Sequence, residues 1–220
     1  MTSSGLLTSG VYALFGKGFG AEKQLLGADL AQYVKLIGEF RYTWGIDRNQ
    51  SIATRFLAGT LLAYGGTRYA PYREQFYIGG ANSLRAFTVR SIGPGAYPPA
   101  RNNRYAYLDQ TGDMKLEANL EYRFRLIGDL HGAVFLDAGN VWLLREREGI
   151  RSGRFSWKNF LNEAALGSGA GIRYDMDILV LRLDCGVALH LPYNTGKSGY
   201  FNVHKYSDYL GIHFAVGYPF

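Results

Sequence analysis

Residue types that commonly carry out chemistry occur throughout this chain, but their spacing does not form the usual catalytic or metal-binding motifs. Serine occurs without the G-x-S-x-G turn that exposes a hydrolase nucleophile. The single cysteine, Cys185, excludes an intrachain disulfide. The four histidines lack the sequence spacing of metal ligands; they are His131, His190, His204 and His213. We therefore expect no catalytic residues, no metal site and no cofactor.

One glycine series imitates a nucleotide-binding loop. Gly167, Gly169 and Gly171 stand two residues apart, but no helix or second strand of a βαβ unit follows them. Residues two apart on a strand share one face of the sheet. We interpret these glycines as room for packing on an inward face.

The charge of the chain is a second candidate signal. A net charge of +6 is compatible with nucleic-acid binding. The Arg and Lys residues, however, are spread over the whole sequence instead of being gathered in one tract. We expect no nucleic-acid partner.

The charged residues instead alternate with apolar ones, which predicts strands. In Met114–Leu126, the apolar residues occupy every second position, and charged residues such as Glu121 and Arg123 fill most of the others. This run of about thirteen residues exceeds the usual strand of about five or six. It is long enough to cross a bilayer at a tilt, whereas no stretch of the chain approaches the roughly 20 apolar residues of a membrane helix.

The same alternation predicts eight strands in all. Their expected ranges are Leu6–Phe15, Ala31–Trp44, Ile52–Tyr64, Met114–Leu126, His131–Trp142, Ala165–Asp175, Ile178–Leu191 and Tyr209–Phe220. Short and long connections alternate between them, as in outer-membrane barrels with short periplasmic turns and long extracellular loops. Aromatic residues near strand ends fit the girdles of such barrels; they are Trp44, Tyr64, Trp142 and Tyr218. The fold class predicted is an all-β, antiparallel transmembrane β-barrel.

The start of the chain bears on its completeness. Met1–Gly5 has neither a basic segment nor a long apolar segment of the kind that begins a signal peptide. An exported barrel needs such a signal. We therefore expect this chain to be the C-terminal piece of a longer protein.

The connection of residues 65–112 is too long for a simple loop in a compact domain. It contains the sequence GGANSLRAF, in which the informative residues are Gly79, Gly80, Asn82, Leu84, Arg85 and Phe87. This segment resembles the long extracellular loop of the BamA/TamA/Sam superfamily, the bacterial surface-antigen barrels that assemble outer-membrane proteins. The loop of that family carries a GG-x-NSLRGF-like signature.

Three further segments support this resemblance. Asn119–Phe124 and Phe135–Trp142 are similar to strands of the family, the second through the pattern F-x-D-x-G-x-V-W. The last residues resemble its C-terminal assembly signal, through Phe214, Val216, Gly217 and Phe220.

The resemblance implies where the loop lies. In the family, the loop folds back into the lumen and its arginine pairs with acidic residues of the inner wall. Carried over to this sequence, Arg85 would meet Glu121 and Asp137, which strand alternation independently places inward. One residue departs from the signature, since Ala86 replaces the glycine that follows the arginine. If that position needs a positive φ, alanine costs about 1 kcal/mol or more.

The resemblance also implies a function and a location. The family barrel has sixteen strands, so residues 1–220 would be its C-terminal half, without the upstream strands or the POTRA domains. The implied protein inserts or translocates outer-membrane proteins at a lateral gate and is not an enzyme. Its partners would be outer-membrane lipid, unfolded client proteins and accessory lipoproteins. It would lie in the outer membrane of a Gram-negative cell with its C-terminus in the periplasm. A passive pore or secretion transporter, and a membrane anchor of an upstream enzyme domain, are the alternatives.

Overall fold

An open antiparallel sheet forms most of the protein. The computed structural model describes residues 31–65, 67, 69–99, 110–176 and 178–220, together with the backbone of residues 2–4, 24–25 and 28–29. Within this part, the sheet has eight strands in the order β1-β4-β5-β6-β7-β8-β9-β10. Their bounds are β1 Thr2–Ser4, β4 Tyr33–Gly45, β5 Gln50–Ala63, β6 Met114–Ile127, β7 Leu130–Trp142, β8 Ala165–Asp175, β9 Val180–His190 and β10 Leu210–Val216. The two edges, β1 and β10, are not paired with each other there, so the sheet is a partial barrel.

Shorter elements complete the described part. β2 (Gln24–Leu25) and β3 (Ala28–Asp29) form a separate two-stranded sheet. Single 3₁₀ turns occur at η1 (Tyr72–Glu74), η3 (Arg151–Gly153) and η4 (Tyr206–Tyr209). Among the residues that the structure describes, no helix has the length and apolar character needed to cross a membrane.

Seven of the eight expected strands correspond to observed ones, from β4 to β10. The expected first strand, Leu6–Phe15, lies outside the described residues. The expected last strand was too long. It ends at Val216 because Gly217 adopts a positive φ of 86°, which turns the chain away from the ladder.

The two faces of the sheet differ as the alternation predicts. On β6, Glu117, Asn119 and Glu121 are buried, whereas the residues between them are exposed. The exposed face carries large apolar side chains on every long strand, for example Phe56, Leu136 and Phe214. Because one face is apolar and solvent-exposed while the other buries charges, the pattern is that of a barrel wall facing lipid.

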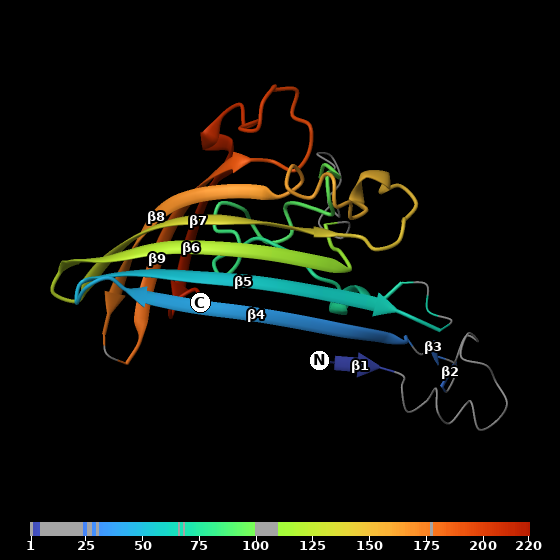
Figure 1. Ribbon diagram of the computed structural model, residues 1–220, viewed down its shortest axis with the longest axis horizontal. Helices are drawn as coiled ribbons and strands as arrows, with labels where there is room; N and C mark the ends of the chain where they lie inside the picture. The colour runs from blue at the N-terminus through green and yellow to red at the C-terminus, as the bar shows by residue number, and fades with distance from the viewer. Residues whose placement is uncertain are drawn as a thin grey trace.

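The sheet curves around one long connection. Residues 64–113, which we call the inner loop, join β5 to β6, and the described residues 69–99 of this loop lie on the concave face (green in Figure 1). The main hydrophobic cluster combines apolar residues of this loop, such as Ile78, Leu84 and Phe87, with residues of the strands around it. The inner loop therefore takes the place of a second layer.

Short and long connections lie at opposite ends of the sheet (Figure 1). The short turns are residues 46–49, 128–129 and 176–179, and the long connections are residues 64–113, 143–164 and 191–209. This arrangement follows from sequential antiparallel pairing, and it agrees with the pattern expected from the sequence.

The connection of residues 143–164 folds over the end of β7. Trp142 is only 1% exposed, although it stands opposite Met114 in the register, on the apolar outer face. Its indole N–H donates to Glu163 Oε2 at 2.7 Å, and the ring of Phe155 packs edge-on against it at 5.5 Å. The expectation that Trp142 belongs to an exposed aromatic girdle was therefore wrong.

The buried position of Glu163 disfavours the charged form of its carboxyl group. Burial raises the pKa of the Glu163 carboxyl above 4.5, and the hydrogen bond from Trp142 opposes that rise only in part. The folded state thus holds a proton on Glu163 more tightly than the unfolded chain does. The free energy of unfolding therefore falls as the pH rises from the ordinary pKa of a glutamate to the raised pKa of Glu163.

We predict that Glu163→Gln makes the protein more stable at neutral pH, because glutamine keeps an acceptor for Trp142 and removes the disfavoured charge. The temperature at which the folded gel mobility is lost, measured over a pH series, should exceed that of the native protein near pH 7 and approach it at acidic pH. Glu148→Gln, at an exposed position of the same connection, is the control. A similar pH profile for native protein and Glu163→Gln would contradict the prediction.

Candidate functional site

The tip of the inner loop is a tight turn that presents Arg85 to the sheet. Gly79 and Gly80 have φ values of 98° and 96°, and a Cβ on Gly79 would collide with the backbone of Thr88. Backbone hydrogen bonds close the turn, from Gly80 N to Phe87 O at 2.8 Å and from Phe87 N to Leu84 O at 3.1 Å. The two glycines are therefore required by the backbone geometry of the turn.

Arg85 is 1% exposed and is bound by two strands. Its Nε and Nη2 donate to the two carboxylate oxygens of Asp137 on β7 at 2.9 and 2.8 Å, and its backbone N–H donates to the same carboxylate at 3.0 Å. Its Nη1 donates to Glu121 on β6. The guanidinium also stacks 3.6 Å from the ring centre of Phe135. The structure thus brings together the arginine and both carboxylates selected from the sequence.

Further buried charges extend this cluster towards β8 and β9. Glu121 also accepts from Arg173 at 3.0 Å and from Arg123 at 2.8 Å. Asp184 lies 2.7 Å from Arg173 and 3.3 Å from Arg182, without hydrogen-bond geometry in either case. Strand alternation places these side chains on the same face as Glu121, but nothing in the sequence connects them to Arg85.

The residues before Arg85 contact strands far apart on the concave face of the sheet. The carbonyl of Asn82 accepts from Arg55 on β5 at 3.0 Å, and its side-chain oxygen accepts from Arg182 on β9 at 2.5 Å. Ser83 donates its hydroxyl to Glu117, and its carbonyl accepts from Asn119 at 2.9 Å. The tip therefore spans the concave face from β5 to β9.

The apolar residues of the motif fill the interior. Leu84 and Phe87 are fully or almost fully buried and belong to the main hydrophobic cluster. Ala86 is also buried, and its methyl group lies where a Cβ on Gly167 would stand. Arg90 is the only non-glycine residue with positive φ in the described part. Ala86 therefore avoids the strain considered for it.

Glycines of three strands receive the loop tip. A Cβ on Gly186 of β9 would lie 2.9 Å from both Arg85 O and Ala86 N, and one on Gly211 of β10 would lie 2.5 Å from Arg85 O. Gly211 stands directly opposite Gly186 in the register. Gly167 on β8 receives Ala86, which agrees with the packing role expected for it. Gly186 and Gly211 were not singled out from the sequence, although they share the inward parity of that series.

The end of the chain returns towards the same cluster. After Gly217, Arg123 Nη2 donates to Phe220 O at 3.3 Å, and the ring of Phe220 lies 5.9 Å from the Arg85 guanidinium. Phe214 and Val216 instead point outward from β10 and are exposed. The four residues of the expected assembly signal thus divide between the two faces.

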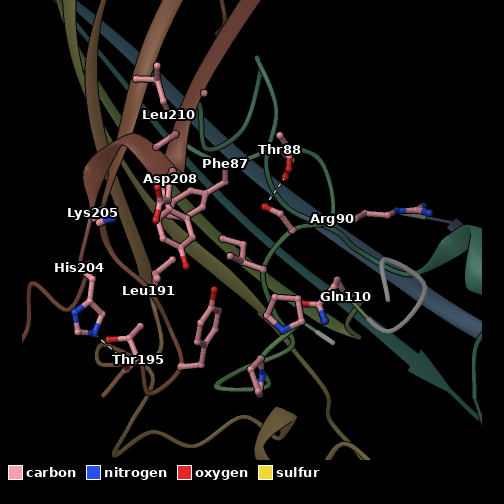
Figure 2. Close-up of a pocket in the computed structure, with 18 of the residues that line it drawn as sticks. Phe87, Thr88, Arg90, Gln110, Leu191, Thr195, His204, Lys205, Asp208 and Leu210 are labelled. Atoms are coloured by element: carbon pink, nitrogen blue, oxygen red, sulfur yellow. Dashed lines mark hydrogen bonds between the residues drawn. The ribbon is translucent and has the colours of Figure 1, made fainter. Parts of the chain in front are cut away.

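A cavity of about 610 Å³ borders the loop tip and the start of β10. Figure 2 shows its wall, where Ser91 donates to Thr88 O at 2.8 Å and His204 lies 3.0 Å from Thr195 O. Its lining also includes Phe87, Leu210 and Gly211. Residues 100–109, between the lining residues Pro99 and Gln110, lie outside the described part. The volume refers to the described residues alone.

The ring of His190 lies between two main-chain carbonyls. His190 Nδ1 lies 2.5 Å from Tyr200 O and Nε2 lies 2.8 Å from Asn162 O, so both ring nitrogens have partners. Among the described residues, no three His, Cys, Asp or Glu side chains are grouped so that they could hold a metal ion.

A family model described as the Omp85 superfamily domain matches residues 6–220. The chain belongs to the Omp85 superfamily. This membership confirms the family resemblance drawn from the loop and strand motifs, and it implies the bacterial outer membrane.

A solved structure supports the fold of this Omp85 chain. The crystal structure of BamA from Haemophilus ducreyi lacking POTRA domains 1–3 matches it with a TM-score of 0.60 and 18% sequence identity. The match covers 87% of this chain and 36% of that chain. The Omp85 chain therefore has the fold of about a third of that structure.

We predict that Gly211→Ala displaces the loop tip, because the new methyl group would press on a backbone carbonyl rather than on a flexible side chain. Overpacking of this kind typically costs about 1–3 kcal/mol. The temperature at which folded gel mobility is lost should fall, and proteases should cleave the inner loop faster. Gly45→Ala is the control, since nothing lies within 4 Å of the added atom. Equal protease resistance of the two variants would show that the loop tip does not need a glycine at position 211.

Proposed function

We propose that this Omp85 chain is part of an outer-membrane factor that inserts or translocates outer-membrane proteins. Membership in the superfamily supports a role in assembly or transport. The barrels of the superfamily are generally non-enzymatic, and the proposed mechanism involves no covalent catalysis. The proposed partners are outer-membrane lipid, unfolded client proteins and accessory lipoproteins.

One observation carries the proposal most directly, namely that the loop tip rests against the edge strand β10. The carbonyl of Arg85 approaches Gly211 so closely that no side chain fits there. β10 pairs with β9 on one side and has no partner on the other within the described residues. An unpaired edge can accept another strand by main-chain hydrogen bonds. Client strands would add at β10, while the loop tip holds that strand in position.

The motif residues then have distinct proposed roles. Gly79 and Gly80 shape the turn, Asn82, Leu84 and Phe87 seat it, and Arg85 fastens it to Glu121 and Asp137. Phe214, Val216, Gly217 and Phe220 serve as the C-terminal signal for assembly of the barrel itself. The ion pairs support the first group of roles, and the exposed apolar face of β10 supports the second.

The proposed setting is a larger barrel. A sixteen-stranded wall would contain this sheet as its C-terminal half, with the upstream strands and POTRA domains in the rest of the protein. The short turns and the C-terminus would face the periplasm. The 36% coverage of the matched BamA chain supports this placement.

We predict that Asp137→Lys, made in the full-length protein, prevents correct assembly of the barrel. It would leave Arg85 buried beside a second cation, and breaking such a buried pair costs about 3–5 kcal/mol. Folded gel mobility and the levels of client proteins should both fall in cells that depend on the variant. Glu148→Lys, the same charge change at an exposed position, should leave both normal. Normal folding and normal client levels in Asp137→Lys would remove the proposed role of the ion pairs.

Edge pairing at β10 is tested by disulfide trapping. Cysteines placed along residues 210–216 of a Cys185→Ser background should crosslink to cysteines in the last strand of a client, with the register of an antiparallel pair. Matched cysteines on β7, which has neighbours on both sides, should not crosslink. Crosslinks that are absent at β10, together with steady ion conductance, would favour a passive pore instead.

A further inference from the structure

An exposed aromatic cluster lies on the connection between β7 and β8. The ring of Trp157 packs edge-on against Phe155 at 5.0 Å and against Phe160 at 5.9 Å. Trp157 itself is 77% exposed, and Leu161 beside it is 66% exposed. Two neighbouring rings therefore support Trp157 at the surface, while most of its side chain stays exposed.

This cluster continues the outer face of the sheet. Phe155 packs on Trp142, whose register position opposite Met114 belongs to the apolar face. That face carries Leu120 and Leu136 on the same two strands, both exposed. The aromatic rings thus extend the lipid-facing surface beyond the end of the β7 ladder, at the end of the sheet that carries the long connections (Figure 1).

The segment that carries the cluster has charged side chains of one sign only, although Glu146 and Glu163 lie just outside it. Residues 149–162 contain Arg151, Arg154 and Lys158 and no acidic residue. Arg154 makes only an exposed contact of 3.8 Å with Glu146, outside this segment. Arg151 and Lys158 have no ion-pair partner in the part of the chain that the structure describes. Three cations therefore flank an exposed tryptophan at the rim of the apolar face.

We propose that residues 151–161 bind the phosphate-bearing headgroups of the outer leaflet, with Trp157 and Leu161 at the level of the acyl-chain boundary. Tryptophan is enriched at membrane interfaces because its ring is apolar and its N–H is polar. Cationic side chains beside it attract anionic lipid phosphates at short range. The site rests on the proposed membrane orientation, in which the long connections face outward. It is separate from the Arg85 cluster and from the edge of β10.

The test uses the full-length protein in phosphatidylcholine vesicles, with or without lipid A as the phosphate-rich lipid. The emission of Trp157 is obtained as the difference between native protein and Trp157→Phe. We expect this emission to shift to shorter wavelength and to be quenched by lipids brominated near the headgroup end of the chain. Both effects should increase with lipid A, and added salt should weaken that increase.

A charge-removal variant and a matched control sharpen this test. Arg151→Gln/Arg154→Gln/Lys158→Gln should lose the dependence on lipid A. Arg48→Gln/Arg125→Gln, in the turn after β4 and near the end of β6 at the other end of the sheet, should keep it. Trp157 emission that acrylamide quenches freely and that neither brominated lipid nor lipid A changes would overturn the proposal.

Client insertion, measured on the same samples, separates this inference from the proposed function. Normal insertion with a water-exposed Trp157 would reject the lipid site alone. A lipid-bound Trp157 in a protein that inserts no client would reject the proposed function alone.

Discussion

The guanidinium of Arg85 imposes the constraint on which the inner loop depends. A charge removed from water is stable only where other charges and hydrogen bonds replace its hydration. Here Asp137 binds the guanidinium on two nitrogens and Glu121 binds a third, while Phe135 covers its face. The constraint is mutual, because both carboxylates are completely buried. Asp137 pairs with no other cation in the described part of the chain, whereas Glu121 also binds Arg173 and Arg123. If the loop left the concave face, Arg85 would lose both of its carboxylates, and the buried Asp137 would be left without a cation beside it.

The rest of the cluster balances this demand. Within this cluster, Arg173 and Arg182 bring the fully buried cations to three, and Asp184 brings the fully buried carboxylates to three. The buried Glu117 pairs separately with Arg55 and Lys115. A balanced cluster tolerates burial, but the loss of one member leaves an excess charge for the others to share. The glycines of β8, β9 and β10 add a steric condition, since only their missing side chains let the backbone of Arg85 and Ala86 approach the wall. Electrostatics therefore fixes the tip to β6 and β7, and close packing fixes it to β10.

The sequence could predict the ion pairs of the loop tip but not its close packing against the glycines. Strand alternation placed Glu121 and Asp137 inward because a side chain's face depends only on its parity. Gly186 and Gly211 have the same parity, yet a glycine shows room only when its neighbour across the strands is known. Trp142 has outward parity and is nevertheless buried, because residues 155–163 fold back over it. The end of β10 at Val216 depended on the conformation of Gly217, which the alternating pattern could not reveal.

The cations on the concave face are buried and paired, whereas those at the rim of the outer face are exposed. This difference separates charges that stabilise the fold from charges that can bind a partner. The cations of the inner cluster contact carboxylates within the protein, where salt screens them little. The cations of residues 151–158 are exposed, and Arg154 and its nearest acidic neighbour, Glu146, are both more than half exposed at 3.8 Å. Exposed charges of this kind contribute little to folding stability. They can bind a partner outside the protein, whereas the guanidinium of Arg85 is bound by carboxylates within it. A change of ionic strength should therefore alter what the rim binds before it alters where the inner loop lies.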